Sequence, residues 1–458
     1  MRSKVSEEAS TMGQRVIRPD RVMCAGFFLL ILLGGVLLSL PLSTITGESI
    51  GLPAGLFTAT SAVCVTGLVV VDTGTTFSLF GQIVLLLLIQ TGGLGFMVFA
   101  TMVMAALGKR ITLRDRLLMR ESLNTSTLSG LARLILWYGL LALAIEGVGA
   151  LLLSTRFVPR FGWVQGLWYS LWHSVSAFCN AGFDLFGGFS SLTSYAGDPV
   201  VLLTVSVLII LGGTGFAVIS EVLERRFCWR ELSLHARLVL TMSGGLLLIG
   251  TAVFLLLEWG NPATLGPLNG LEKVLNAFFQ SVTMRTAGFN SVDLAAMTDG
   301  SKLTSILLML IGANSASTGG GMKTTTVAVL TLAVWAVIRG REDVTAMGRR
   351  FPKELVLRAL AVVSVTVLVF LCGTMALTIA EGGDMPFIDL MFETASAMAT
   401  VGVTSAGTPE MSLASKIVLV PMMYIGRVGP LTLALALANR KDEQKNRLRY
   451  PEESVTIG

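Results

Sequence analysis

Charged residues are scarce in this chain and make up only 14% of its 458 positions. Soluble domains carry about 25%, and two or three such domains would need far more polar surface than this sequence supplies. Because apolar residues reach 53%, the composition excludes a soluble enzyme, a nucleic-acid-binding protein and a disordered chain. It indicates a multi-pass protein that is embedded in a membrane and has no nucleic acid as a partner.

Side chains that commonly hold metals or carry out redox chemistry are also few. The five cysteines occur singly, without a CxxC pair, and the two histidines, His173 and His235, lie far apart. These spacings exclude a zinc knuckle and a redox pair, and they argue against an imidazole-rich metal site.

Eight long apolar runs dominate the sequence, at residues 22–41, 76–107, 131–155, 199–223, 237–258, 303–338, 357–380 and 413–438. Between the two runs of each successive pair lies a shorter segment, at 53–64, 166–178, 271–283 and 386–398. As a helix, such a segment is about 18 Å long, roughly half of a hydrocarbon core about 30 Å thick. We expect it to enter the membrane and return, with its return stretch lining water or protein.

Basic residues are distributed unevenly around these runs. Twenty-six of the 34 lysines and arginines fall in residues 1–21, 108–133, 224–237, 339–358 and 440–449. Cytoplasmic loops collect such residues. The bias therefore predicts that both termini are cytoplasmic and that the four half-length segments lie toward the outer side.

A glycine-containing tetrapeptide follows each half-length segment. The four are Val65-Thr66-Gly67-Leu68, Asn180-Ala181-Gly182-Phe183, Thr286-Ala287-Gly288-Phe289 and Thr400-Val401-Gly402-Val403, with glycines 115, 106 and 114 residues apart. A period near 110 predicts four copies of one unit, in which a helix, a half-helix, a glycine loop and a second helix follow one another. The predicted boundaries are an N-terminal tail at 1–20, repeats at 21–107, 131–226, 227–338 and 354–440, cytoplasmic linkers at 108–130 and 339–353, and a C-terminal tail at 441–458.

Four such loops around a pseudo-fourfold axis suit an ion filter. Backbone carbonyls can replace the hydration shell of a cation, and glycine permits the turns and the close approach that this needs. The half-helices direct their partially negative C-terminal ends at the centre. Small residues also serve helix packing in membranes, but four glycines at matched positions favour the filter. The expected fold is an all-α polytopic membrane protein, with four helix–pore loop–helix repeats around one pore.

The chain resembles the Ktr/Trk/HKT superfamily of potassium transporters, most closely its bacterial Ktr-type membrane subunits. The motifs that carry the resemblance are Ala62-Val63-Cys64-Val65-Thr66-Gly67-Leu68, Arg285-Thr286-Ala287-Gly288-Phe289-Asn290-Ser291 and Gly426-Arg427-Val428-Gly429-Pro430-Leu431. The resemblance implies that Gly67, Gly182, Gly288 and Gly402, with the residues beside them, form a selectivity filter. Glycine rather than serine at position 67 implies K⁺ as the permeant ion. Whether Na⁺ is co-transported or only activates stays open.

The sixth apolar run is interrupted at mid-depth by small and polar residues. They are Gly312, Ala313, Asn314, Ser315, Ala316, Ser317, Thr318, Gly319, Gly320, Gly321 and, after Met322, Lys323. Glycine is costly inside a helix, so we expect a break here, and non-helical backbone at this depth must face a water-filled path. The resemblance implies a gate beneath the filter, with a simple packing kink as the alternative.

Arg427 lies within the last apolar run, 25 residues after Gly402. A charge near mid-membrane costs about 2.5–3.5 kcal/mol on insertion scales, so it usually faces a cavity or a partner. We expect Arg427 to hydrogen-bond carbonyls or hydroxyls of residues 312–326 and to add an electrostatic barrier to cations. A packing or snorkelling role is the alternative.

Together these features predict an ion-translocating subunit for potassium uptake across the bacterial inner (plasma) membrane. We expect that this subunit is not an enzyme and that it holds no metal other than the permeant monovalent cation. The resemblance implies a homodimer that docks on a cytoplasmic, nucleotide-binding regulatory ring of the KtrA type. A secondary transporter of another cation or small solute is the alternative, although the inverted repeats of that class are not expected here. An intramembrane hydrolase using Ser315 or Ser317 would lack a histidine base in a comparable span.

Overall fold

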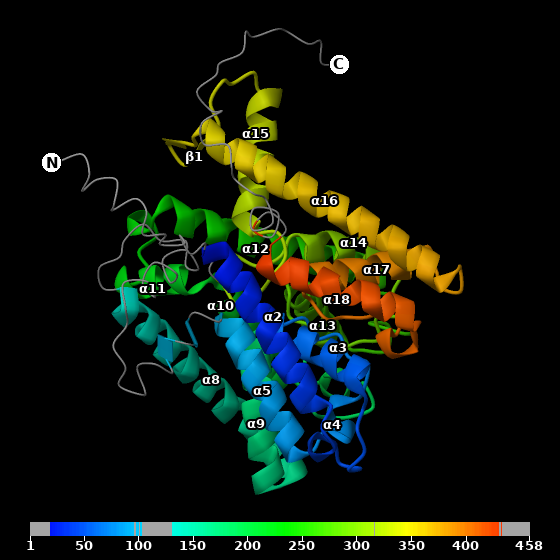
Figure 1. Ribbon diagram of the computed structural model, residues 1–458. Coiled ribbons are helices and arrows are strands. Elements are labelled where there is room, and N and C mark those ends of the chain that lie inside the picture. Colours follow the sequence, from blue (N-terminus) through cyan, green and yellow to red (C-terminus); the bar gives the residue numbers. More distant parts are fainter. Residues whose placement is uncertain are drawn as a thin grey trace, which may run out of the picture.

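The computed structural model describes residues 19–95, 98–99, 101–102, 131–315, 317–429 and 432 (Figure 1). The predicted N-terminal tail up to residue 18, the linker at 108–130, Ala316 of the predicted gate and the C-terminal tail at 441–458 lie outside these residues. The described residues are mostly helical, so the predicted all-α class is confirmed. A short hairpin within the predicted linker at 339–353 is the exception.

The elements follow the chain in this order. The α-helices are α2 (Pro19–Leu38), α3 (Leu52–Val63), α4 (Thr73–Thr76), α5 (Leu79–Leu94), α8 (Leu131–Phe161), α9 (Trp163–Phe178), α10 (Pro199–Thr214), α11 (Phe216–Glu224), α12 (Leu234–Glu258), α13 (Gly270–Thr283), α14 (Asp299–Leu310), α15 (Thr324–Ile338), α16 (Lys353–Glu381), α17 (Phe387–Met398) and α18 (Leu413–Val428). The 3-10 helices are η1 (Pro41–Ser43), η2 (Thr193–Tyr195), η3 (Trp229–Glu231) and η4 (Thr408–Glu410). Strands β1 (Thr345–Ala346) and β2 (Arg349–Arg350) pair antiparallel, with Thr345 opposite Arg350.

The first helix of each predicted repeat is long and apolar. These helices are α2, α8, α12 and α16, and within the described residues they are the four that are long and apolar enough to cross a membrane unbroken. Their surfaces expose large apolar side chains such as Leu151, Leu256 and Met375. A helix that is apolar on all sides is typical of a membrane span, and the protein is a multi-pass membrane protein.

Each predicted half-length segment forms a short helix. These half-helices, α3, α9, α13 and α17, begin and end within three residues of the predicted bounds. In α13 a capping box formed by Asn269 and Glu272 satisfies free N–H groups at the start of the helix. All four half-helices end just before a residue with positive φ in the glycine loop that follows, a conformation that ends helical hydrogen bonding.

The closing helices of three repeats end at a glycine with positive φ, and that of the third repeat ends at a loop. Helices α5, α10 and α18 end at Gly95, Gly215 and Gly429, which have φ values of +85°, +95° and +93°. Glycine adopts this conformation at little cost, and it stops a helix. After Gly215 the chain bends by 98° into α11, and loop 311–323 separates α14 from α15. The break predicted for the third repeat is therefore present, and the second repeat has a break of a different form.

The repeats follow one another around a common centre. The closing helix of each repeat contacts the half-helix of the next: α5 contacts α9, α10 contacts α13, α14 contacts α17, and α18 contacts α3. The last pair joins the end of the chain to its beginning. The Tyr424 hydroxyl of α18 also donates to the Cys24 carbonyl of α2 at 2.8 Å, and Figure 1 shows orange α18 beside blue α2.

Glycines in three closing helices permit this close packing. A Cβ on Gly92, Gly212 or Gly426 would collide with the carbonyl at the C-terminal end of the half-helix in the same repeat, which belongs to Val63, Phe178 or Met398. Small residues let membrane helices approach closely. These three contacts set the distance between each half-helix and its closing helix.

Gly426→Ala should lower the apparent melting temperature of the purified protein, because its methyl group would push α18 away from α17. Overpacking of this kind costs about 1–3 kcal/mol. Gly244→Ala in α12 is the matched control, since nothing lies within 4 Å of the added methyl group and alanine favours a helix. Thermal unfolding followed by tryptophan fluorescence measures both variants, and equal melting temperatures would contradict the packing role of Gly426.

Candidate functional site

The four glycine loops, residues 65–68, 180–183, 286–289 and 400–403, share one backbone conformation. The first residue of each loop has φ between +53° and +73°, although none of the four is glycine. The third residue is always glycine, with φ between +70° and +94°. Left-handed non-glycine residues cost about 1–3 kcal/mol each and cluster at functional sites. The same strain at the same position of four loops indicates a shared task.

The amide groups of each loop face its own half-helix. In the first loop, Thr66 N donates to Ser61 O at 2.7 Å and Gly67 N donates to the Ser61 hydroxyl at 3.0 Å. The equivalent backbone bonds run from Ala181 N to Ser176 O and from Val401 N to Ser396 O, both at 2.8 Å. In the third loop Ala287 N donates to Thr283 O, four residues back instead of five, at 3.0 Å. The C=O and N–H groups of a trans peptide point in opposite directions. The carbonyls of Val65 and Thr66 therefore face away from the half-helix, toward the centre of the four repeats.

The loops meet one another in a closed ring. A Cβ on each glycine would collide with a carbonyl of the next loop, so that Gly67 lies against Ala181, Gly182 against Ala287, Gly288 against Val401 and Gly402 against Thr66. The fourth contact closes the circle. Any side chain at these positions would force the loops apart, so glycine is required by the close approach as well as by the positive φ.

The carbonyls of the first three residues in each loop have no donor. Within the described residues, no N–H or O–H group donates to them. The fourth residues differ: Phe183 O accepts from Trp172 and Ser176, and Phe289 O accepts from Thr283, while the side chains of Leu68, Phe183, Phe289 and Val403 are buried in the core. Interior carbonyls are nearly always paired. A ring of unpaired ones, at the negative ends of four half-helices, is suited to coordinate a dehydrated cation.

Loop 311–323 lies directly against the third and fourth glycine loops. A Cβ on Gly319 would collide with the Thr286 hydroxyl, and a Cβ on Gly320 would collide with the Thr400 hydroxyl. Thr286 and Thr400 are the first residues of their loops, next to the half-helix ends. Loop 311–323 therefore covers the end of the carbonyl ring that lies nearest the C-terminal ends of α13 and α17.

Hydrogen bonds to the second repeat fix this loop in place. Asn314 N donates to Gly213 O at 3.1 Å, and Thr318 N donates to Gly212 O at 3.2 Å. The Thr318 hydroxyl donates to Phe178 O, the last carbonyl of α9, at 3.1 Å. The loop belongs to the third repeat, so these bonds tie it to the neighbouring second repeat.

Two basic side chains contact the same loop. Arg427 donates to the carbonyls of Thr318 and Gly92, and to that of Gly93 at 3.3 Å. The predicted hydrogen bond between Arg427 and residues 312–326 is thus present, and the same guanidinium also caps the C-terminus of α5, where a positive charge is favoured. Lys323 Nζ donates to Gly319 O at 2.9 Å.

Sequence reasoning missed the serines that hold the loops. Ser61 and Ser396 accept from Gly67 N and Gly402 N at 3.0 Å, and Ser176 donates to a carbonyl of its own loop at 2.8 Å. Each serine stands six residues before the loop glycine, a spacing that is visible in the sequence. The third repeat has valine at that position.

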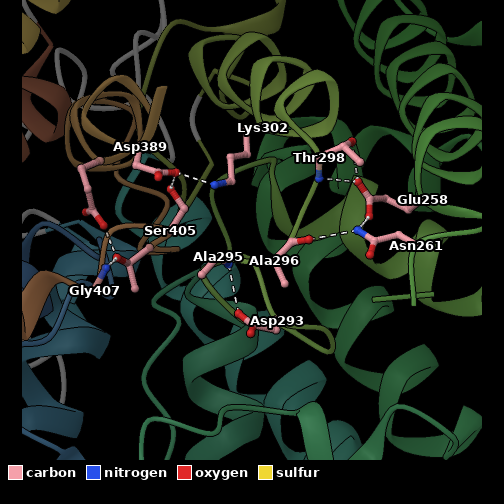
Figure 2. A network of polar contacts seen from close by, with 12 residues as sticks. Glu258, Asn261, Asp293, Ala295, Ala296, Thr298, Lys302, Asp389, Ser405 and Gly407 are labelled. Atoms are coloured by element: carbon pink, nitrogen blue, oxygen red, sulfur yellow. Dashed lines mark hydrogen bonds and ion pairs between the residues drawn. The ribbon is translucent and has the colours of Figure 1, made fainter. Parts of the chain in front are cut away.

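Sequence reasoning also missed a buried ion pair between the third and fourth repeats. Lys302 of α14 donates to Asp389 of half-helix α17 at 2.7 Å, and both side chains are about nine-tenths buried. The Ser405 hydroxyl donates to the same carboxylate at 2.9 Å, and Figure 2 shows Lys302 and Ser405 converging on it. Ser405 lies three residues after Gly402, so the ion pair holds the segment that leaves the fourth glycine loop.

A second carboxylate of α17 supports the same segment. Glu393 is buried and accepts hydrogen bonds from the hydroxyls of Thr404 and Thr408. Thr404 Oγ1 in turn accepts from Gly407 N at 2.8 Å. Asp389 and Glu393 therefore hold the segment that leaves the fourth loop, whereas Ser396 holds the loop glycine, Gly402.

The two serines of the hydrolase alternative have structural partners. The Ser315 hydroxyl lies 3.3 Å from that of Thr325, and the Ser317 hydroxyl donates to Asn314 O at 2.6 Å. His173 lies elsewhere, with its ring packed against Phe157 and Phe186. These contacts give neither serine a base.

The apolar spans, and the ring of carbonyls to which no described group donates, are typical of multi-pass transporters of cations. Within that class, the chain belongs to the TrkH family, described as cation transport protein, whose model matches residues 31–448. Its family is one of transporters, consistent with the expectation of a non-enzymatic protein.

Relatives of known name cover nearly the whole chain. The chain is 45% identical to the Ktr system potassium uptake protein B of Bacillus subtilis, over 96% of this chain and 97% of that protein. It is 39% identical to the potassium/sodium uptake protein NtpJ of Enterococcus hirae, over 96% and 98%. The crystal structure of the potassium transporter TrkH from Vibrio parahaemolyticus has the same fold, with a TM-score of 0.69 at 20% identity over 93% of this chain and 86% of that one.

Lys302→Met should destabilise the protein by about 3–5 kcal/mol, because it leaves the buried Asp389 carboxylate without its counter-charge. The double variant Lys302→Met/Asp389→Asn should recover most of the loss, since the amide carries no charge and still accepts from Ser405. Lys353→Met, at an exposed position, is the control. The apparent melting temperature measures all three, and a single variant as stable as the wild type would refute the role of the ion pair.

Proposed function

We propose that this chain is the ion-translocating subunit of a Ktr-type system for potassium uptake across the bacterial inner membrane. The observation that carries the proposal is the closed ring of carbonyls without hydrogen-bond donors. Such a ring can replace the water around a monovalent cation. The names of the relatives, potassium uptake protein B and potassium/sodium uptake protein, support K⁺ as the substrate and leave a role for Na⁺.

The orientation of the chain in the membrane is inferred from the charge bias of the sequence. Basic residues gather at both termini and in the linkers between repeats, which favours a cytoplasmic location for these parts. With the repeat boundaries expected from the sequence, the four half-helices and their glycine loops then lie toward the outer side. Potassium enters from outside, loses its water at Gly67, Gly182, Gly288 and Gly402, and meets loop 311–323 next.

Loop 311–323 acts as the gate in this proposal. Its contacts with Thr286 and Thr400, at one end of the carbonyl ring, support this role. Hydrogen bonds from Arg427 and Lys323 to Thr318 and Gly319 carbonyls keep it there, and both side chains add positive charge below the ring. Opening requires that these bonds break.

The proposed assembly is a homodimer bound to a cytoplasmic ring of nucleotide-binding subunits of the KtrA type. The relatives named as Ktr system proteins belong to systems of more than one component. The motifs of this chain resemble that family in the filter and in the gate, the two parts that a regulator must control. A regulatory subunit would act by releasing loop 311–323.

Gly288→Ser should lower the preference for K⁺ over Na⁺ at least tenfold, because the new side chain would meet Val401 O at 2.5 Å and force the ring open. Rubidium uptake into liposomes containing the purified protein, with Na⁺ as competitor, measures the preference. Gly47→Ser is the matched control, since Gly47 also has positive φ but nothing within 4 Å. An unchanged preference would refute the filter assignment, and wild-type uptake of another solute in place of rubidium would favour a secondary transporter.

Arg427→Ala should raise the potassium leak of liposomes that contain the chain without any regulatory partner. A hydrogen bond from a charged group contributes about 1.5–3 kcal/mol, so roughly a tenfold to hundredfold higher flux is expected. Arg427→Lys keeps the charge and should show a smaller increase. Equal potassium flux in the wild type and Arg427→Ala, at equal protein density, would contradict the gate proposal.

A further inference from the structure

The end of α8 carries two arginines that the ion path does not use. Arg156 and Arg160 are four residues apart and so lie on one face of the helix. α8 has 31 residues and is therefore ~46 Å long, longer than a hydrocarbon core about 30 Å thick. Its C-terminal turns reach the headgroup region, on the side of the membrane toward which the glycine loops open.

These two arginines line an open groove of about 410 Å³ between α8 and the segment from η2 to the start of α10. Ser194, Tyr195 and Asp198 line its other wall. Arg156 Nε lies 3.4 Å from the Asp198 carboxylate, and the Arg160 guanidinium lies over the Tyr195 ring at 4.9 Å. The groove therefore has one positive charge in excess.

The other basic side chains on this side of the membrane are engaged by the protein. Lys273, Arg285, Lys302 and Lys416 each donate a hydrogen bond to a protein oxygen. Arg160 contacts the rings of Phe161 and Tyr195 and has no carboxylate within ion-pair distance in the described part of the chain, so its charge is not neutralised there. A guanidinium fork suits a phosphate, which it can bind through two parallel hydrogen bonds.

Apolar surface continues from the groove toward the middle of the membrane. Val148, Leu151 and Leu152 of α8 are 58%, 69% and 47% exposed, and Trp163 and Val164 beside the groove are 76% and 88% exposed. A free phosphate would use none of this surface. A phospholipid would use both parts, with its phosphate in the groove and its acyl chains along α8.

We propose that this groove binds the phosphate of an anionic phospholipid, such as phosphatidylglycerol. The proposal needs α8 to cross the membrane but does not depend on which solute the chain transports. The bound lipid fills the space between α8 and the η2 segment of the second repeat, next to half-helix α9, and so braces the outer wall of that repeat.

Native mass spectrometry of the detergent-purified protein tests the proposal. The probes are dioleoylphosphatidylglycerol, dioleoylphosphatidylcholine and inorganic phosphate, each titrated separately. The wild type should retain phosphatidylglycerol in preference to phosphatidylcholine. Arg156→Ala/Arg160→Ala should bind phosphatidylglycerol about thirtyfold more weakly, the factor that two basic side chains supply at a lipid surface. The matched control is Arg225→Ala/Arg230→Ala, which removes the same charge from exposed positions between α11 and α12.

Each other outcome overturns the proposal. Equal loss in the control variant would mean that binding follows net charge, and equal retention of phosphatidylcholine would mean that the phosphate site has no preference for an anionic lipid. Phosphate that displaces phosphatidylglycerol at equal concentration would mark a free-anion site. If the alanine variant does not fold, the charge-preserving variant Arg156→Lys/Arg160→Lys is measured instead, and it should retain binding of phosphatidylglycerol. Failure of ion uptake by the wild type would leave these results unchanged, so the two proposals fail separately.

Discussion

The backbone carbonyls of the four glycine loops have no donor in the described part of the chain, and much of the structure keeps them that way. The amides of the loops are occupied by serine and threonine groups of the half-helices. The half-helices are fixed by glycine contacts with the closing helices. Without these supports the loops would relax toward ordinary φ values, because four left-handed non-glycine residues store several kcal/mol of strain. Interior carbonyls are nearly always paired, and in the proposed function the permeant cation is the partner of these carbonyls.

The broken closing helices follow from the same constraint. A half-helix can reach the centre only if the closing helix lies close behind it, and Gly92, Gly212 and Gly426 allow that approach. Gly95, Gly215 and Gly429, which follow them by three residues, end α5, α10 and α18. The packing and the end of each of these closing helices therefore depend on neighbouring glycines in one short motif.

Much of the fold could be predicted from the sequence, because period and length carry strong information in a membrane protein. The half-helices fall within three residues of the expected bounds, since a segment too short to cross must return. The breaks after α5, α10 and α18 could not be predicted in the same way. Gly95, Gly215 and Gly429 differ from packing glycines only in φ, which composition does not reveal. The ion pair of Lys302 and Asp389 joins residues 87 positions apart, and only the cyclic order of the repeats brings them together. Ser61, Ser176 and Ser396 were within reach of the sequence, through their common spacing from the loop glycine.

The third repeat departs from the fourfold pattern, and this departure bears on control. Its half-helix has Val282 where the others have serine, and Gly312 lies against Gly320 of its own loop rather than against the half-helix carbonyl. Loop 311–323 follows the closing helix α14 of this repeat and lies against the third and fourth glycine loops. Loop 311–323 of this repeat is held by individual hydrogen bonds. Arg427 and Lys323 donate to its carbonyls, and its own Asn314 N and Thr318 N donate to the carbonyls of Gly213 and Gly212. In the proposed function, this asymmetry separates selection of the ion, which needs a rigid ring of four loops, from control of its passage, which needs a segment that moves.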